Sequence, residues 1–352
     1  MDKIDLKGKT VEELEEFVVS LGESPFRARQ LFRWIYAKGV SDFELITDIS
    51  KVTKEKFTAV SYISALKVQK IIKSDSGDTE KFLFALPDGN FIESVLMYYD
   101  QQKKNRSTIC ISSQVGCAQG CVFCASGRNG LIRNLTVAEI VDQVIQIQNY
   151  VKNSGGRVHN VVIMGIGEPL VNFDNFVKAV HLINHGDGIG ISIRRIAVST
   201  VGIPELIRKF ADTGLGIRFA VSLHAPDDKV RDKIMPVNKK YPIATLLEAC
   251  RYYQRKTGRR VTFEYTLIDG LNDSLEHAEA LGQLIKDIHC LLNIIPLNPV
   301  EGLPFKRPSI GRCRAFANYL EKFGFKVAFR TERGTNIDAA CGQLRLKEHE
   351  KI

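Results

Sequence analysis

The sequence predicts an α/β protein, in which a small N-terminal α+β domain precedes a partial (β/α)6 barrel. Two observations lead to this fold class. From about residue 105 onward, short apolar runs rich in β-branched residues alternate with amphipathic helical stretches, which is the pattern of a parallel sheet. Before that point, helical patterns are followed by two strand-like runs around a turn. We therefore expect an N-terminal domain over residues 1–100 and a barrel over residues 101–345.

The N-terminal domain is predicted to contain helices followed by a β-hairpin. Thr10 and Glu13 have the spacing of a capping box, and apolar residues recur after them at helical spacing. A second helix is expected between Pro25 and Gly39, and it carries several arginines. Residues 81–99, KFLFALPDGNFIESVLMYY, are typical of two strands that flank a Pro-Asp-Gly turn.

The barrel is predicted from six short apolar runs. They lie at residues 108–112, 160–165, 195–200, 217–223, 261–268 and 292–297. The clearest helix between them begins after Thr136, which has Glu139 at capping-box spacing and a broad apolar face behind it. In a barrel of this kind the reactive residues lie at the carboxyl ends of the strands, so polar residues there are candidates for the site.

Composition and charge indicate an ordinary globular protein that is basic. Hydrophobic residues make up 44% of the chain and charged residues 25%, and the net charge is +9. Such a charge fits a polyanionic partner, although a basic surface without that role is the alternative. The polar N-terminus and the lack of a long apolar run favour a cytoplasmic protein without membrane contact.

Four of the eight cysteines are concentrated in CISSQVGCAQGCVFCASG, residues 110–127. A structural disulfide framework is not expected in a reducing compartment, and three of the remaining cysteines are interpreted as packing residues. These packing residues are Cys250, Cys290 and Cys313.

Three cysteines in the loop after the first barrel strand have C-x3-C-x2-C spacing: Cys117, Cys121 and Cys124. A structural zinc site would need four ligands, usually as two pairs, and the chain has no second C-x2-C. A [4Fe-4S] cluster is the favoured interpretation, because three thiolates on four irons leave one iron open to a ligand.

Small or polar residues stand where further barrel strands end. These residues are Gly167, Glu168, Ser199, Ser222, His224 and Asn298. Taken singly, the glycine and glutamate would indicate an ordinary turn, and the histidine a structural residue. Because the same position recurs on successive strands, we expect these side chains to meet in one cavity.

Several motifs together resemble one enzyme family. CISSQVGCAQGCVFCASG, MGIGEPL, VSLHAP, MPVNKKYPI, LIDGLNDSLEHA, IPLNPV and IDAACGQL occur in this order, and with FRARQLFRWIY they extend over nearly the whole chain. The cysteine spacing after the first strand resembles the radical SAM superfamily. The full set is similar to the RlmN and Cfr family of radical SAM RNA adenine methyltransferases, and more similar to its RlmN branch. The resemblance implies a radical SAM barrel with one [4Fe-4S] cluster and with S-adenosylmethionine as methyl donor and radical source.

The resemblance also implies roles for individual residues. Cys117, Cys121 and Cys124 would bind the cluster, and S-adenosylmethionine would contact Gly167, Glu168, Ser199, Ser222, Leu223, His224 and Asn298. Cys341 would carry a methyl group, from which a carbon radical forms and adds to the adenine ring. Glu93 would then accept the ring proton. Cys110 would attack the sulfur of Cys341, so that the product leaves and a transient disulfide remains.

The implied function is methylation of C2 of an adenosine in 23S rRNA at the peptidyl-transferase centre, with the tRNA adenosine 3′ of the anticodon as a further candidate substrate. An unstacked base would reach the barrel, while the arginine-bearing N-terminal helix holds RNA. The expected chain is a monomer, reduced by a donor such as flavodoxin or ferredoxin. Three alternatives stay open: Cfr-type methylation of C8, a radical SAM enzyme that transfers no methyl group, and a zinc-stabilised RNA-binding protein.

Overall fold

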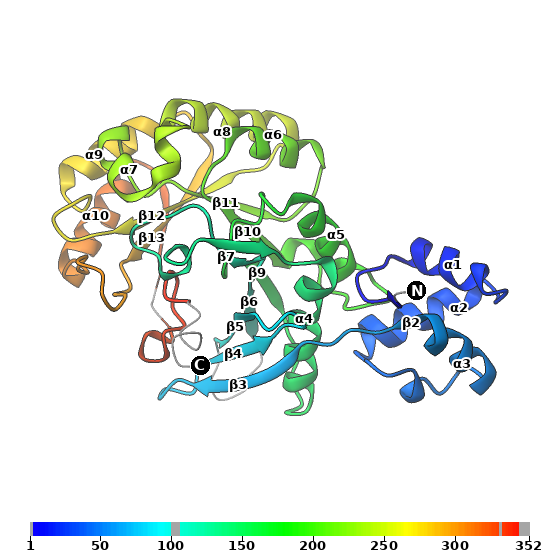
Figure 1. The fold of residues 1–352 in the computed structure, drawn as a ribbon. Coiled ribbons are helices and arrows are strands. Elements are labelled where there is room, and N and C mark those ends of the chain that lie inside the picture. Colours follow the sequence, from blue (N-terminus) through cyan, green and yellow to red (C-terminus); the bar gives the residue numbers. More distant parts are fainter. Residues whose placement is uncertain (1–2, 100–105, 331–332, 345–352) are drawn as a thin grey trace.

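A mixed ten-stranded sheet runs through the molecule (Figure 1), and the computed structural model describes residues 3–99, 106–330 and 333–344. The strand order is β14-β13-β12-β11-β10-β9-β6-β5-β4-β3. The parallel strands are β6 (Ser107–Ile111), β9 (Asn160–Ile163), β10 (Ile196–Thr200), β11 (Arg218–Ser222), β12 (Val261–Leu267), β13 (Cys290–Pro296) and β14 (Lys326–Phe329). Since β14 and β3 lie at opposite edges, the sheet is open and the parallel part forms a partial barrel. This confirms the predicted fold class, although β14 was not predicted.

Helices cover the outer face of the parallel strands (Figure 1). They are α4 (Val137–Lys152), α5 (Phe173–Asn184), α6 (Pro204–Asp212), α8 (Ile243–Thr257), α9 (Leu275–Ile285) and α10 (Ile310–Lys322). The predicted capping box of α4 is present, because Thr136 and Glu139 each accept a hydrogen bond from the other's backbone. The helices pack their apolar faces onto strands that are buried on both sides, as parallel strands usually are.

Three antiparallel strands extend the sheet beyond β6. They are β3 (Lys67–Lys73), β4 (Thr79–Ala85) and β5 (Phe91–Tyr98), and β4 and β5 form the predicted hairpin. β5 in turn pairs with β6, with Val95 opposite Cys110. The hairpin and the barrel therefore share one sheet across residue 100, the position expected to separate two domains.

Residues 4–62 form a helical lobe beside the sheet (Figure 1). It contains α1 (Val11–Ser20), α2 (Phe26–Phe32), the π-helical turn η1 (Arg33–Ala37), η2 (Phe43–Leu45), α3 (Lys51–Val60) and the paired strands β1 (Ile4–Asp5) and β2 (Ser61–Tyr62). A buried ion pair between Lys7 of the lobe and Asp142 of α4 joins it to the barrel. Asp142 also accepts a hydrogen bond from the backbone of Leu66 at 2.6 Å. The lobe is therefore attached to α4 near its first strand, through Lys7, and just after its last strand, through Leu66.

The remaining short elements lie in the connections between strands and helices or after the last strand. They are the paired strands β7 (Gln114–Gly116) and β8 (Leu131–Asn134), the 3-10 turns η3 (Ala125–Gly127), η4 (Ile193–Arg195), η5 (Pro236–Lys239) and η6 (Thr335–Ile337), and helix α7 (Asp228–Ile234). Within the described ranges, every helix is too short or too polar to cross a membrane.

Candidate active site

The cysteine loop lies between β7 and β8, next to the carboxyl ends of the parallel strands. Cys117, Cys121 and Cys124 all line one cavity, and each is partly buried. The loop is tied to its surroundings through its backbone, because Val122 donates to the carbonyl oxygen of Ile234 at 3.0 Å. Burial raises the pKa of the Cys117 thiol to about 12. Such thiols ionise when a bound metal compensates the thiolate charge.

The three thiols fit the group that the sequence indicated. All three come from one loop and line one wall of the cavity. Residues at the ends of the parallel strands form the opposite wall. Among the described residues, no three His, Cys, Asp or Glu side chains are close enough together to hold a single metal ion.

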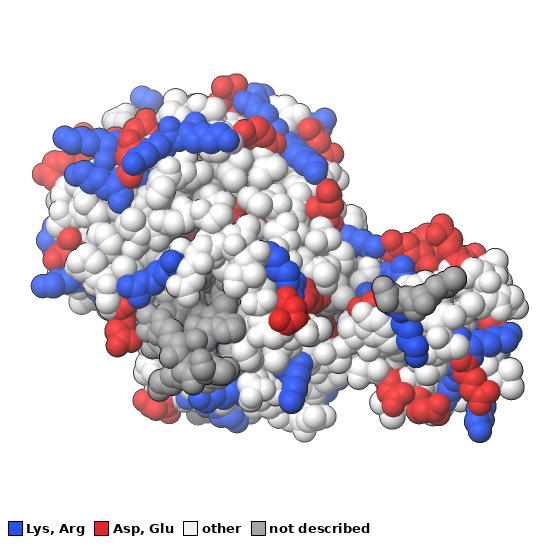
Figure 2. All heavy atoms as spheres, viewed as in Figure 1, with Lys and Arg blue, Asp and Glu red and all other residues white. Residues whose placement is uncertain are grey.

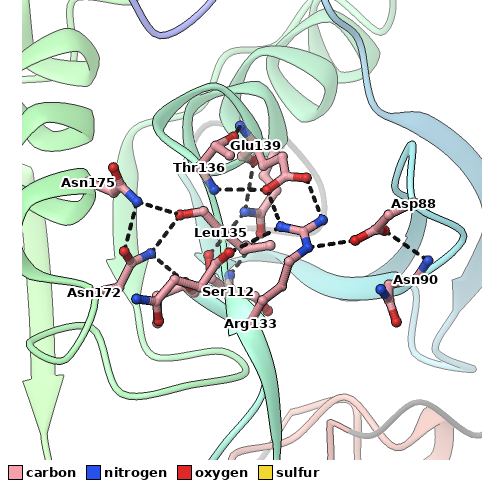
Figure 3. A network of polar contacts seen from close by, with 12 residues as sticks. Asp88, Asn90, Ser112, Arg133, Leu135, Thr136, Glu139, Asn172 and Asn175 are labelled. Atoms are coloured by element: carbon pink, nitrogen blue, oxygen red, sulfur yellow. Dashed lines mark hydrogen bonds and ion pairs between the residues drawn. The ribbon is translucent and has the colours of Figure 1, made fainter.

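A network of polar contacts anchors the strands on either side of the cysteine loop (Figure 3). Arg133 of β8 contacts Asp88 in the turn of the β4–β5 hairpin at 2.6 Å and Glu139 of α4 at 2.8 Å. At the end of β8, the carbonyl oxygen of Leu135 accepts hydrogen bonds from the side chain of Asn172 at 2.7 Å and from that of Asn175. The residues that follow the cysteine loop are therefore held in place by these contacts.

Gly167 and Glu168 form the wall of the cavity after β9. Gly167 has a φ of +107°, and a Cβ atom there would lie 2.5 Å from the Cβ of Gln114. Only glycine fits this close approach. The Glu168 carboxylate accepts hydrogen bonds from the backbone of Val201 at 2.8 Å and of Leu170 at 3.1 Å, and burial raises its pKa to about 7. A cationic ligand at this wall would favour the ionised carboxylate.

His224 follows β11 and is held in one tautomer. Its Nδ1 accepts a hydrogen bond from the backbone of Thr266 at 3.0 Å, and burial lowers its pKa to about 3. The ring is therefore neutral, with its proton on Nε2. The residue has a φ of +57°, an uncommon value for a residue with a side chain. The strained turn and the fixed ring together place a hydrogen-bond donor in the cavity.

Two further strand ends complete the wall. The hydroxyl of Ser199 donates to Oε2 of Glu264 at 2.7 Å, and the side-chain amide of Asn298 donates to the carbonyl oxygen of Cys341 at 3.1 Å. Ser222 lines the cavity, whereas Leu223 is fully buried beside it.

The chain returns to this cavity at its C-terminal end. Residues 333–344 cross the open side of the sheet, and Cys341 is the exposed thiol among the eight cysteines. Cys110 on β6 is buried, and burial raises its pKa to about 12. Both cysteines line a second cavity, which shares Cys124, Asn298 and Cys341 with the first. Two thiols more than two hundred residues apart in sequence therefore line the same cavity.

Glu93 lies on β5, outside the residues that line the two cavities. Its carboxylate is nearly buried and is 3.0 Å from the ammonium nitrogen of Lys81. Since Glu93 and Val95 are two residues apart on one strand, Glu93 faces the same side as Val95, which lines the second cavity.

Comparison with known proteins agrees with this arrangement. The family model of the radical SAM superfamily matches residues 111–281, and that of the ribosomal RNA large subunit methyltransferase N-terminal domain matches residues 4–63. A probable dual-specificity RNA methyltransferase RlmN from Geobacillus thermodenitrificans is 47% identical over 343 residues, which cover 97% of this chain and 93% of that protein. The chain belongs to the RlmN family.

Other RlmN relatives agree over the same length. One from Thermoanaerobacter sp. is 45% identical and covers 97% of this chain and 98% of its own. A radical SAM methyltransferase from Sphaerobacter thermophilus has a solved structure that superimposes with a TM-score of 0.92 at 42% identity, covering 97% of this chain and 99% of that chain. The resemblance inferred from sequence motifs is therefore confirmed. Membership of the radical SAM superfamily implies a [4Fe-4S] cluster and S-adenosylmethionine, and it disfavours the zinc interpretation.

The structure also places residues in the RlmN site that the sequence did not indicate. Glu264 of β12 and Arg330 after β14 both line the first cavity, and they form an ion pair at 3.8 Å. A glutamate inside the apolar run VTFEYTLI was the available signal for Glu264. The packing role expected for Cys250, Cys290 and Cys313 is confirmed, since all three are buried.

Proposed function

We propose that this protein methylates C2 of an adenosine in 23S rRNA, and that it also accepts the tRNA adenosine 3′ of the anticodon. One observation carries the proposal: the thiols of Cys110 and Cys341 line the same cavity, and Cys341 also lines the neighbouring cavity of the three loop cysteines. Ring carbons of adenine are electrophilic, so a methyl cation cannot be transferred to them directly. An acceptor thiol that carries the methyl group and a second thiol that frees the product meet this difficulty.

Cys341 is the proposed methyl carrier. It is exposed at the border of both cavities, where an RNA base and the cofactor can each reach it. When bound, the [4Fe-4S] cluster and S-adenosylmethionine supply the methyl group, the electron and the radical. We assign the cluster to Cys117, Cys121 and Cys124, since these thiols share one cavity wall.

S-adenosylmethionine is assigned to the strand ends opposite these cysteines. The residues are Gly167, Glu168, Ser199, Ser222, Leu223, His224 and Asn298. The Glu168 carboxylate suits an ammonium group, the space above Gly167 suits close approach of a ligand, and the Nε2 proton of His224 suits an acceptor atom. The side chain of Leu223 is fully buried beside the cavity, so Leu223 is included as the neighbour of Ser222 and His224.

Glu93 and Cys110 complete the proposed reaction. After the methylene radical on Cys341 has added to the ring carbon, the adduct has to lose one electron and one proton. The electron returns to the cluster, when bound, and Glu93 accepts the proton of the ring carbon. Cys110 then attacks Sγ of Cys341, so that an S–S bond forms and the S–C bond breaks. The bonding pair and a proton go to the methylene carbon, which becomes the methyl group. Cellular thiols later supply the two electrons that reduce the disulfide, which agrees with a cytoplasmic location.

The helical lobe is the proposed grip for RNA outside the reacting base. Arg29 and Arg33 are both exposed and lie four residues apart on α2 and η1. Figure 2 shows a largely uncharged area over the barrel, with Lys and Arg side chains interspersed with Asp and Glu around it. The uncharged area suits a base, and the basic side chains at its rim suit phosphates. A flavodoxin- or ferredoxin-like donor is the proposed reductant, and one chain the proposed active unit.

Product analysis tests the assignment. The protein is reconstituted anaerobically with iron and sulfide, and it is reacted with 23S rRNA and S-adenosylmethionine before nucleoside mass spectrometry. We expect 2-methyladenosine. Formation of 8-methyladenosine alone would replace the assignment by Cfr-type chemistry, and cofactor cleavage without any methyladenosine would remove RNA methylation.

The Cys110→Ala variant tests the role of the second thiol. Without Cys110 the S–C bond cannot be broken, so RNA should stay covalently joined to Cys341 and appear as a slow band on a denaturing gel. Cys250→Ala, which removes a buried thiol elsewhere in the core, is the matched control and should release its product. Normal release from Cys110→Ala would exclude the proposed disulfide step.

A further inference from the structure

Lys81 lies between two parts of the proposed site that are far apart in sequence: Glu93 on β5 and the segment that carries Cys341. It is on β4, opposite Val95 of β5, and Val95 in turn lies opposite Cys110 of β6. Because side chains alternate along a strand, Lys81, Glu93 and Cys110 project from the same face of the sheet. The segment that carries Cys341 packs on this face, where Ala339 and Leu344 cluster with Val95 and Cys110.

The ammonium group of Lys81 contacts both of these parts. Nζ is 3.0 Å from Oε1 of Glu93, and it donates to the carbonyl oxygen of Asp338 at 3.4 Å. The side chains of Lys81 and Glu93 are only 9% and 5% exposed. A buried ammonium group is expensive to desolvate unless it is paired and hydrogen-bonded, so both acceptors matter to its position.

Its partners are themselves held in place. The backbone carbonyl of Glu93 accepts a hydrogen bond from the hydroxyl of Ser112 at 2.6 Å. Asp338 has a φ of 50° and a ψ of 41°, a left-handed conformation in which the chain turns shortly before it reaches Cys341. Such a conformation persists only where surrounding contacts hold it, and the hydrogen bond from Lys81 is one such contact.

We propose that Lys81 is a positioning residue, which holds the proton acceptor Glu93 and the Cys341 segment in register for proton removal from the RNA-bound intermediate. The inference rests on the proposed function and names a residue to which no role has been given. A base attached to Cys341 can approach Glu93 only if the turn at Asp338 is held against the sheet. Lys81 connects the two directly, across 257 residues of sequence.

The first test measures the position of the segment without RNA or turnover. In the reconstituted holoenzyme, Cys341 is the exposed thiol, so iodoacetamide should alkylate it selectively. Lys81→Met removes the hydrogen bond to Asp338 while keeping an unbranched apolar stem, and the alkylation rate should rise several-fold. Lys73→Met is the matched control, because Lys73 of β3 pairs with Glu80 of β4 at 3.4 Å but is 62% exposed. Its alkylation rate should equal that of the unaltered protein.

The second test measures proton removal. Single-turnover rates should fall about 10- to 100-fold in Lys81→Met, since a small misplacement of a reacting group has effects of this size. RNA covalently joined to Cys341 should accumulate, whereas the RNA concentration at half-maximal rate stays unchanged. Glu93→Gln should accumulate the same species. The double variant should be no slower than Glu93→Gln, because residues that act as one unit do not have additive effects.

The outcomes separate this inference from the proposed function. Alkylation and single-turnover rates equal to those of the unaltered protein in Lys81→Met, with Glu93→Gln impaired, would overturn the role of Lys81 alone. So would additive effects in the double variant, which indicate a general structural role. Absence of methyladenosine from the unaltered protein would instead overturn the proposed function. If Lys81→Met does not retain its cluster, Lys81→Leu, which also lacks a hydrogen-bond donor, has to show the same results.

Discussion

Replacing Arg231 with methionine tests how the strand ends of the site are held together. Arg231 of α7 is fully buried. Its guanidinium donates to the carbonyl oxygens of Val201, Ser222 and Leu223 at distances between 2.7 and 3.1 Å, and to Oδ1 of Asn238 at 2.9 Å. Burial lowers the pKa of Arg231 to about 10, so the group remains charged at neutral pH. Methionine preserves the apolar stem but donates no hydrogen bond, so one buried and two partly buried carbonyls lose this donor.

The expected loss can be worked out from these contacts. An unsatisfied buried acceptor costs about 1–3 kcal/mol, and breaking a buried charged network costs about 3–5 kcal/mol in total because the terms are not additive. Unfolding entropy is about 2.1 cal/mol/K per residue, which gives about 0.7 kcal/mol/K for this chain. Arg231→Met should therefore lower the melting temperature by about 4–7 °C.

Thermal unfolding of the anaerobically prepared holoenzyme, followed by circular dichroism, measures this shift. Arg251→Met is the matched control, since Arg251 forms an exposed pair with Asp287 at 2.9 Å. Exposed pairs contribute less than about 1 kcal/mol, so this variant should melt within about 1 °C of the unaltered protein. If Arg231→Met melted equally close to it, the argument from unsatisfied carbonyls would be refuted.

Three further predictions concern the cavity wall and the contacts that hold the residues beside the cysteine loop. Gly167→Ala, whose Cβ would lie 2.5 Å from a carbon of β7, should weaken S-adenosylmethionine binding at least about tenfold in a filter-binding assay; Gly89→Ala, with no atom within 4 Å, should bind normally. The hydrogen bond and ion pair with Arg133 lower the pKa of Asp88 to about 2, so this pair stabilises the fold above the ordinary carboxyl pKa and stops doing so as the pH falls through about 2. Because Asp88 is partly exposed, Asp88→Asn should lose less than about 1 kcal/mol at pH 7 in urea unfolding, and a loss that persists undiminished at pH 2 would contradict this origin. His224 should show the neutral Nε2-protonated ring from pH 5 to pH 8 by 15N NMR, and a titration near pH 6.5 would contradict its burial.

The parts of the fold that local sequence determines were predictable. Capping residues and apolar spacing identified α1 and α4, and the six apolar runs identified six of the parallel strands. The continuity of the sheet was not predictable, because the pairing of Val95 with Cys110 joins a hairpin to a barrel strand across a segment with no helical or strand pattern. A short exposed edge strand such as β14 leaves little apolar signal in the sequence.

In the site, too, the features set by local sequence were predictable and those set by distant partners were not. The cysteine spacing is a local pattern, and it indicated the loop that lines the cavity. Lys81 and Arg231 gave no such signal, because a lysine or arginine in a sequence is expected at the surface. Their burial becomes evident only when distant partners are in place, such as the carbonyl oxygen of Asp338 for Lys81. Buried charges in this chain are therefore features of the tertiary structure.

The most direct test of the central claim compares the unaltered protein with Cys341→Ala. Both are reconstituted anaerobically and reacted with 23S rRNA and S-adenosylmethionine, and methyladenosine is quantified by mass spectrometry together with 5′-deoxyadenosine. The two-thiol account predicts 2-methyladenosine from the unaltered protein and none from Cys341→Ala. Methyladenosine formed by Cys341→Ala at the rate of the unaltered protein would contradict it.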